Sequence, residues 1–324
     1  MSKRSIAGQV PVGKTPGAQG VRYVSVDEAG AGQRLDNFLL RQLKGVPKTH
    51  VYRVIRSGEV RVNSARADAD TRVAVGDRIR VPPVRIAERK PSAAPPREFP
   101  LLFEDEHLLA IDKPAGVAVH GGSGVSFGVI EQLRQARPQA RFLELVHRLD
   151  KETSGVLLLA KKRSALTALQ EQFRARAPGK TYAALVAGAW PANKKVIDVP
   201  LHKFVDAGGE RRVRPASPDD EGRRSITLVR VAETFAQFTL LDVTIRTGRT
   251  HQIRVHLAHE GHAIAGDPKY GDFALNRQLA RGEHRFARMF LHAARLAFDH
   301  PGSGERIELQ APLPPDCATL LGQL

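Results

Sequence analysis

A proline-rich run divides this sequence and limits what each side of it can fold into. Residues 90–97 read Lys-Pro-Ser-Ala-Ala-Pro-Pro-Arg. Proline lacks a backbone N–H and has a fixed φ, so repeated prolines exclude both a helix interior and a central strand. We therefore predict a semi-rigid linker at 86–98, a small domain at 21–85 and a large domain at 99–324.

The first 20 residues are rich in glycine and polar residues and lack periodicity, which predicts a flexible tail. Within it, residues 8–15 match the phosphate-binding pattern G-x-x-x-x-G-K-[ST] letter for letter. That loop needs a buried strand before it and a helix after it, but Pro16 and Gly17 oppose a helix. We interpret the match as a coincidence and expect no nucleotide cofactor.

The composition excludes several classes of protein. The 324 residues are 42% hydrophobic and 26% charged, which is typical of a globular protein. The sequence has no apolar run long enough to span a membrane and no secretory signal. Cys317 is its single cysteine, which excludes intramolecular disulfides and multi-cysteine metal sites. We expect a cytoplasmic protein and, because no coiled-coil pattern demands an assembly, a monomer.

Positive charge is concentrated in the small domain. The chain has 50 Lys and Arg against 34 Asp and Glu, a formal net charge of +16. Residues 34–90 hold 14 Lys and Arg against 6 Asp and Glu, which is half of that excess. Neutralisation of phosphates by such cations supplies most non-specific affinity for nucleic acid. The clustering favours a nucleic-acid-binding module over a uniformly basic protein.

The small domain has the pattern of two amphipathic helices and short strands. Apolar residues from Leu35 to Leu43 follow one helix face, and a second short helix is expected after Pro47. Alternation predicts strands at 60–62, 72–75 and 78–81.

This stretch resembles the S4 RNA-binding domain. The likeness is carried by Arg34-Leu35-Asp36, by the strand entry at 58–63 and by residues 75–81. An ordinary solvated basic face is the alternative to RNA binding. The resemblance implies that the exposed cations of the helices contact structured RNA, and these candidates are Arg34, Lys48, Arg53 and Arg56.

The large domain alternates short apolar runs with helical segments. Strands are predicted at 108–111, 155–160, 182–186 and 238–243, and a helix at 164–176. The strands are not spaced as a regular βαβ series. We therefore predict an α+β fold with a mostly antiparallel mixed sheet flanked by helices.

Polar residues concentrate beside these strands in the glycine-rich loop at 112–124 and in the segments 146–155 and 246–256. Together these segments resemble the RluA-type RNA pseudouridine synthases. The motif His-Arg-Leu-Asp-x-x-Thr-Ser-Gly at 147–155 carries most of the likeness. Lys180-x-Tyr182 and the segment 248–256 support it.

The resemblance implies an enzyme that converts specific uridines of 23S ribosomal RNA, free or in a pre-ribosomal particle, to pseudouridine. The N1–C1′ bond breaks, the uracil turns, and a C5–C1′ bond forms. Breaking the glycosidic bond builds positive charge at C1′, which a carboxylate can stabilise or attack. Asp150 is the implied catalytic carboxylate. Whether it attacks C1′ or removes a sugar proton is left open, and the chemistry requires no metal, redox group or other cofactor.

The same resemblance implies roles for further residues. Arg254 matches the position that pairs with the catalytic carboxylate. Arg148 matches a residue that fills the space left when the uridine is flipped out of its stack, and Tyr182 offers a ring and a hydroxyl to the uracil. Three more motif residues are expected to bind RNA, namely His147, Lys180 and Arg249.

Each of these residues has a structural alternative. Asp150 could cap a turn, Arg254 could be an ordinary strand arginine, and Tyr182 could be a core aromatic. Their occurrence together and in family order favours the functional interpretation.

Two other classes of protein are considered. A non-catalytic RNA-binding or ribosome-assembly factor is disfavoured because the candidate catalytic residues are intact. A glycoside hydrolase or nucleosidase would share the carboxylate chemistry, but it would not explain the S4-like module or the charge.

A histidine cluster near the third motif suggests a metal site. It comprises His251, His256, His259 and His262. The zinc motif H-E-x-x-H is absent and no cysteines assist, so we expect structural or RNA-facing roles and no metal.

Overall fold

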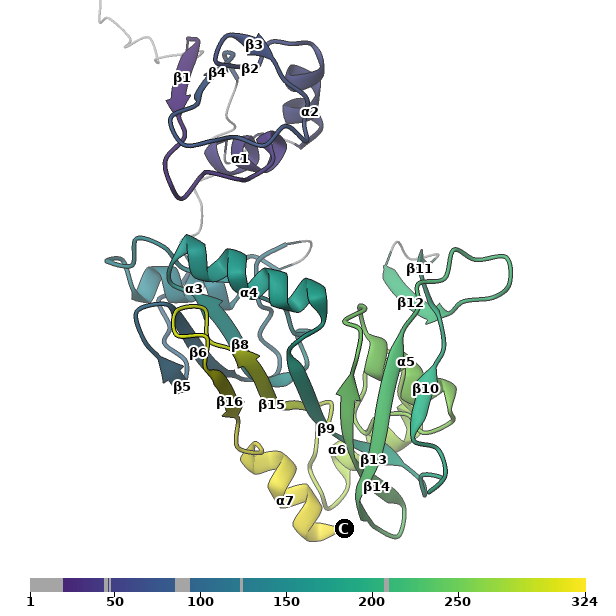
Figure 1. Cartoon of the computed structure of the whole chain (residues 1–324). Helices are drawn as coiled ribbons and strands as arrows, with labels where there is room; N and C mark the ends of the chain where they lie inside the picture. Colours follow the sequence, from purple (N-terminus) through teal and green to yellow (C-terminus); the bar gives the residue numbers. More distant parts are fainter. Residues whose placement is uncertain (1–19, 44–45, 47, 85–93, 123–124, 207–209) are drawn as a thin grey trace, which may run out of the picture. The chain divides into compact units, whose positions relative to one another are not determined.

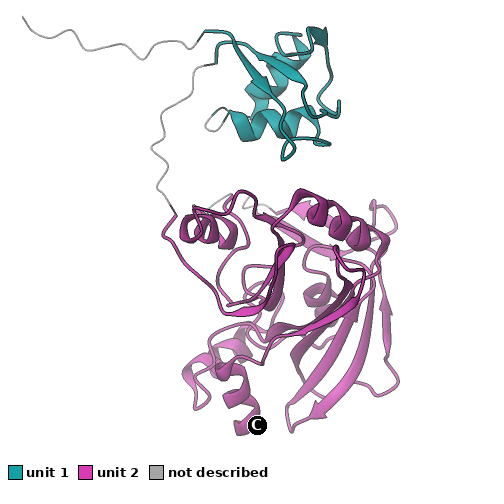
Figure 2. Cartoon of the chain, turned by 60° about the vertical axis from the view of Figure 1, so that its left-hand side comes forward, with its two compact units in different colours: residues 1–91 teal, residues 92–324 magenta. Residues whose placement is uncertain are grey.

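The chain forms two compact units, residues 1–91 and 92–324, shown in different colours in Figure 2. The computed structural model describes residues 20–43, 46, 48–84, 94–122, 125–206 and 210–324. The predicted tail apart from Gly20, the match at 8–15 and the part of the predicted linker before residue 94 lie outside the described residues. The domain boundaries at 85 and 99 stay predictions.

Unit 1 is a small antiparallel sheet packed with two helices (Figure 1). Its strands lie in the order β1-β4-β2-β3. The elements are β1 Arg22–Ser25, α1 Leu35–Gln42, α2 Lys48–Arg56, β2 Arg61–Val62, β3 Ala65–Arg66 and β4 Arg78–Val81. The apolar faces predicted from the helical spacing form the core of the unit, because Leu35 and Phe38 of α1 and Val51 of α2 are buried.

The strand predicted at 72–75 is wrong. Only a single bridge joins Arg72 to Arg34. The N–H of Val73 donates to the carbonyl of Gln33, so this segment bonds to the loop before α1 and not to a neighbouring strand.

Unit 2 is built on one large sheet with strand order β10-β13-β14-β9-β15-β8-β6-β5, and β16 and β7 pair with its members β15 and β8 (Figure 1). The β8–β15 pair is parallel and the other described pairs are antiparallel. The strands are β5 Leu101–Glu104, β6 Leu108–Lys113, β7 Glu144–Leu145, β8 Ser154–Ala160, β9 Gly179–Ala187, β10 Val196–Asp198, β13 Ile226–Thr234, β14 Phe238–Ile245, β15 Leu291–Asp299 and β16 Arg306–Gln310. The predicted mixed, mostly antiparallel α+β fold is confirmed.

Helices cover both faces of this sheet. They are α3 Val129–Ala136, α4 Arg163–Ala175, α5 Gln252–His259, α6 Phe273–Arg281 and α7 Pro315–Gln323. Side chains alternate along each strand, so neighbouring residues enter different cores. Leu157 of β8 packs with α3, whereas Leu158 packs with α4. Ala184 of β9 packs with α5, whereas Leu185 packs with α6 and α7. Every residue of β8 is therefore buried.

Tyr182 of β9 packs against both the α3 core and the α5 core. These two helices therefore cover the same face of the sheet, on either side of its centre. The loop before β8, the middle of β9 and helix α5 meet there, and this is where the candidate site lies.

A separate hairpin projects from unit 2. Its strands are β11 Leu201–Val205 and β12 Arg211–Pro215, which pair with each other in a two-stranded sheet. Residues 207–209 between them lie outside the described part of the chain.

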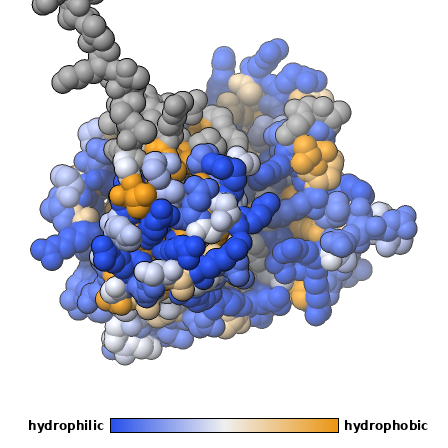
Figure 3. Space-filling model, turned by 90° about the horizontal axis from the view of Figure 1, so that it is seen from above, coloured by the Kyte–Doolittle hydropathy of each residue, from blue (hydrophilic) through white to orange (hydrophobic). Residues whose placement is uncertain are grey.

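The surface is mainly hydrophilic where Figure 3 shows it, and the hydrophobic residues on that face form small separate patches. In the described part of the chain, no helix is long and apolar enough to cross a membrane.

Gly155 fixes the close approach of β8 and β15. Its φ is +110°, and a Cβ at this position would lie 2.3 Å from the carbonyl oxygen of Ala293. We predict that Gly155→Ala lowers the free energy of unfolding by about 2–4 kcal/mol, because the strands must separate or the backbone must strain. Thermal unfolding followed by circular dichroism measures this.

The matched control is Gly322→Ala in α7, where a Cβ would meet no atom within 4 Å. We expect this control to leave the free energy of unfolding unchanged or to raise it by up to about 1 kcal/mol, because Ala favours a helix more than Gly does. Equal stability of Gly155→Ala and the wild type would contradict the packing described for β8.

Candidate active site

A cavity of about 110 Å³ lies at the centre of the sheet face that carries α3 and α5. Its lining comes from the loop before β8, from β9 and from the segment that enters α5, and includes Arg148, Asp150, Tyr182, Arg249, His251 and Arg254. An engineered cavity of about 150 Å³ encloses benzene, so this smaller space can enclose part of one flat ring and leaves the rest of that ring at its mouth. The fold thus brings residues of the motifs at 147–155, 180–182 and 248–256 to one place.

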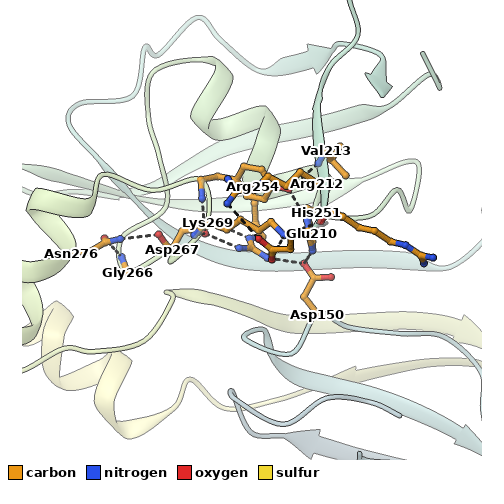
Figure 4. Close-up of polar contacts among 12 residues, drawn as sticks. Asp150, Glu210, Arg212, Val213, His251, Arg254, Gly266, Asp267, Lys269 and Asn276 are labelled. Carbon is orange, nitrogen blue, oxygen red and sulfur yellow. Dashed lines mark hydrogen bonds and ion pairs between the residues drawn. The ribbon is translucent and has the colours of Figure 1, made fainter. Parts of the chain in front are cut away.

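Asp150 lies in the turn between β7 and β8, where the N–H of Thr153 donates to its carbonyl oxygen at 3.2 Å. Figure 4 shows its carboxylate pointing toward Arg254 and His251. Its Oδ2 accepts a hydrogen bond from Nη1 of Arg254 at 3.4 Å and lies 3.9 Å from Nε2 of His251. The carboxylate is 18% exposed, so one side of it faces the cavity.

Arg254 is held by a buried carboxylate, Asp267. Its Nε and Nη2 donate to the two oxygens of Asp267, each at 2.7 Å. The two side chains are 5% and 1% exposed. The planar guanidinium fork suits this bidentate geometry, which leaves Nη1 for Asp150. Arg254 lies on helix α5, so the alternative of an ordinary strand arginine is wrong.

The ionised forms of this pair support each other. Burial alone would raise the pKa of Asp267, but the bonds and charge of Arg254 hold that pKa below its usual value. Burial would lower the pKa of Arg254, but its bonds to Asp267 raise it. Asp267 also accepts the N–H groups of Lys269 and Tyr270, so the carboxylate that orients Arg254 is itself fixed by backbone.

His251 lies near the same oxygen of Asp150 as Arg254 does, and it is oriented by Tyr270. The hydroxyl oxygen of Tyr270 accepts the N–H of Val213 at 3.1 Å and lies 2.8 Å from Nδ1 of His251. We assign the hydroxyl hydrogen to the bond with Nδ1, which puts the proton of a neutral imidazole on Nε2, facing Asp150. Burial lowers the pKa of His251, although the charge of Asp150 opposes this, and so favours the neutral ring.

Tyr182 and Arg148 line the cavity in different ways. Burial, together with the charge of Asp150, raises the pKa of Tyr182, so its hydroxyl keeps its proton. Arg148 is exposed and lines both the cavity and the grooves that adjoin it. Within the described part of the chain, its guanidinium has no hydrogen bond or ion pair, so it can turn toward a ligand.

The other motif residues predicted to bind RNA have different environments. Nε2 of His147 accepts the N–H of Leu158 at 3.1 Å, and its ring stacks on Phe173 with centroids 5.0 Å apart. Burial lowers the pKa of His147 to about 4, which agrees with a neutral ring that accepts a hydrogen bond. Lys180 lies over the ring of Phe173, and Arg249 donates to the carbonyl of Arg224. Lys180 and Arg249 line a groove beside the cavity.

In unit 1, the predicted RNA-binding residues lie on and beside the helices. Lys48, Arg53 and Arg56 are exposed on α2. Arg34 lies just before α1 and makes a bidentate ion pair with the buried Asp36, so its guanidinium is partly engaged within the domain.

The histidine cluster makes internal bonds. Nε2 of His256 donates to the carbonyl of Val199, and Nδ1 of His262 donates to the carbonyl of Ala187. The described residues contain no group of three or more His, Cys, Asp or Glu side chains arranged to hold a metal ion.

Three residues around the site were not predicted from the sequence, namely Lys113, Asp267 and Tyr270. Lys113 is fully buried, and its ammonium donates to the carbonyls of Pro114, Val117 and Lys151, the last of which follows Asp150. Burial lowers the pKa of Lys113 to about 7. A lysine two residues after the strand predicted at 108–111 was the available signal for it. No spacing rule connects Asp267 or Tyr270 to Asp150.

Two family models match the chain. The model described as RNA pseudouridylate synthase matches residues 107–259, and the S4 domain model matches residues 33–79. The first match contains the segments 112–124, 146–155 and 246–256, and the second contains Arg34-Leu35-Asp36 and the strand entry at 58–63.

Full-length relatives and a solved structure are also similar. The chain is 51% identical to ribosomal large subunit pseudouridine synthase C of Escherichia coli (strain K12) over 300 residues, which are 90% of this chain and 93% of that protein. It is 48% identical to the protein of the same name from Pasteurella multocida (strain Pm70), over 94% of each. The structure of human RNA pseudouridylate synthase domain containing 4 covers 69% of this chain and 92% of its own, with a TM-score of 0.57 and 27% identity.

We predict that Asp267→Asn lowers the free energy of unfolding by about 3 kcal/mol, because it leaves the charge of Arg254 buried without its partner. The control is Asp242→Asn, whose carboxylate pairs at the surface with Arg230 and Arg295. This control is expected to cost less than about 1 kcal/mol. Urea unfolding monitored by fluorescence measures both variants, and equal losses would contradict the special role of the buried pair.

Proposed function

The chain belongs to the RNA pseudouridylate synthase family and is an RNA pseudouridine synthase, and we propose that it isomerises specific uridines of 23S ribosomal RNA. The observation that carries the proposal is the meeting of Asp150, Tyr182 and Arg254 at one cavity. Its relatives at 48–52% identity are named ribosomal large subunit pseudouridine synthase C, which supports ribosomal RNA as the substrate.

Asp150 acts on the sugar of the target uridine. When the N1–C1′ bond breaks, positive charge develops at C1′, and an ionised carboxylate stabilises this charge, attacks the carbon or removes a proton from the sugar. Nη1 of Arg254 at 3.4 Å keeps the carboxylate oriented and favours its ionised form. After the uracil turns, C5 bonds to C1′, the proton leaves C5 and N1 carries a proton. The product therefore has the same atoms as the substrate, and no cofactor is consumed.

The target nucleotide must leave its stack before its sugar reaches Asp150. Arg148 is exposed beside the cavity, and its planar guanidinium can stack in the space the base vacates. Tyr182 places a ring and a protonated hydroxyl in the same cavity, where the ring can lie against the uracil and the hydroxyl can donate to it. These two residues act as the support for a flipped-out uridine.

Unit 1 supplies affinity for structured RNA. Lys48, Arg53 and Arg56 are exposed on α2, and contacts from such cations to phosphates position a protein on RNA without reading its sequence. The substrate is held by unit 1 and modified by unit 2.

We predict that Asp150→Asn abolishes pseudouridine formation in 23S ribosomal RNA, with a loss of at least about 1,000-fold, equivalent to about 4 kcal/mol of transition-state stabilisation. Stability and RNA affinity should stay near those of the wild type, because the substitution keeps the size of the side chain. Mass spectrometry of nucleosides released from treated RNA measures the product. A fully active variant would overturn the role of Asp150, and a wild type that binds this RNA without modifying it would support a binding factor.

We predict that replacing Lys48, Arg53 and Arg56 together by Gln weakens RNA binding and reduces the slope of log affinity against log salt by about two, since each lost phosphate contact removes about 0.7. The matched control replaces Arg22, Arg72 and Arg78, which lie on or between the strands of unit 1, by Gln. Fluorescence anisotropy at several salt concentrations measures both variants. A control slope reduced as much as that of the α2 variant would show that α2 has no special role.

A further inference from the structure

The cations on and around the β11–β12 hairpin fall into two classes, and the first class is neutralised within the protein. Arg214 pairs with Asp220 at 2.9 Å, and Arg224 pairs with Asp198 at 3.1 Å. Arg212 pairs with Asp206 and Glu210, and Lys269 pairs with Glu210. These side chains already have counter-charges, so they contribute little net attraction for an external anion.

The second class has no counter-charge in the described part of the chain. Its hairpin members are Lys203 on β11, Arg211 at the start of β12, and Arg223, whose backbone bridges to Leu201. All three side chains are exposed, and none makes an ion pair with another described residue. Such a set of unpaired cations is unfavourable in isolation and favourable beside an anion.

These cations lie close enough to repel one another. The pKa of Lys203 is lowered first by partial burial, and then by the positive charges of Arg148, Arg223, Arg249 and Arg211. Arg148 and Arg249 come from the motif loops beside Asp150. Unpaired cations of the hairpin therefore lie near the arginines at the rim of the cavity.

A groove connects this region to the cavity. It is lined by Arg148, Lys203, Arg211, Thr250 and His251, among others. Three of these residues also line the cavity that contains Asp150. The phosphates on either side of a nucleotide in the cavity are covalently joined to that nucleotide. The RNA strand must therefore leave the cavity along a groove of this kind.

We propose that Lys203, Arg211 and Arg223 form a clamp that binds the backbone phosphates flanking the flipped-out uridine. This proposal rests on the proposed function, and it specifies which part of the RNA this surface binds. Arginine forks and the lysine ammonium bind phosphate oxygens without reading bases. The clamp therefore positions the RNA strand next to Asp150. This contact is additional to the RNA contacts proposed for unit 1.

The hairpin is also joined to the catalytic centre by hydrogen bonds. The N–H of Val213 on β12 donates to Tyr270, which bonds to His251 beside Asp150. RNA phosphates bound to the clamp thus hold β12 in place. Through Tyr270, β12 supports the imidazole of His251, which faces Asp150.

The test is a double-mutant cycle between protein cations and RNA phosphates. The substrate is a 23S ribosomal RNA stem-loop that the wild type modifies, with and without uncharged methylphosphonate linkages on both sides of the target uridine. The test variant is Lys203→Gln/Arg211→Gln/Arg223→Gln. The control variant, Arg212→Gln/Arg214→Gln/Arg224→Gln, loses the same charge from paired positions of the same region.

The clamp predicts that the uncharged linkages weaken binding by the wild type and by the control variant about tenfold, and binding by the test variant less than about twofold. The test variant should also have a salt slope smaller by about two. Thermal unfolding confirms that both variants are folded.

The remaining outcomes overturn the clamp. Equal effects of the linkages on all three proteins would show that the three cations do not contact these phosphates. Equal loss of affinity in both variants would assign the effect to net charge alone. Unchanged RNA binding by the test variant would assign the surface to another acidic partner. A wild type that forms no pseudouridine in this RNA would instead contradict the proposed function.

Discussion

The buried ion pair between Arg254 and Asp267 is the interaction on which the geometry of the candidate active site depends. Two bonds of 2.7 Å fix the guanidinium, and its third nitrogen then faces Asp150. Removing two charges from water is costly unless geometry and further bonds compensate. Here the backbone N–H groups of Lys269 and Tyr270 provide those further bonds to Asp267. The pair thus holds helix α5, the loop after it and the carboxylate of Asp150 in one fixed arrangement.

The sheet explains why these groups meet. Strands β8, β9 and β15 lie side by side at its centre, and the loop that carries Asp150 enters β8 directly. Gly155 allows β8 to approach β15 closely, while Lys113 on β6 bonds to the carbonyl that follows Asp150. Helices α3 and α5 cover the same face on either side of its centre, and the cavity is lined by the loop before β8, by β9 and by the start of α5. The buried residues on both faces of the sheet therefore support a cavity whose rim is exposed and basic.

Residue patterns predicted much of this arrangement, because they depend on local physics. The helix face from Leu35 and the strands at 108–111 and 155–160 follow from hydrophobic periodicity, and the structure confirms them. The prediction of a strand at 72–75 was wrong because the backbone of this segment bonds to the loop before α1. The alternation of apolar and polar residues cannot reveal such a bond. The motifs brought Asp150 and Arg254 to attention. They could not reveal Asp267, because a bidentate pair between a helix and the loop after it depends on the tertiary fold.

We propose that the cavity around Asp150 acts on uridines of 23S ribosomal RNA. Mapping every pseudouridine in the ribosomal RNA of cells that lack this protein, and of the same cells after its gene is restored, tests the claim most directly. We expect a defined set of 23S positions to lose pseudouridine in the cells that lack the protein and to regain it on restoration. An unchanged map, or losses confined to other RNAs, would contradict it.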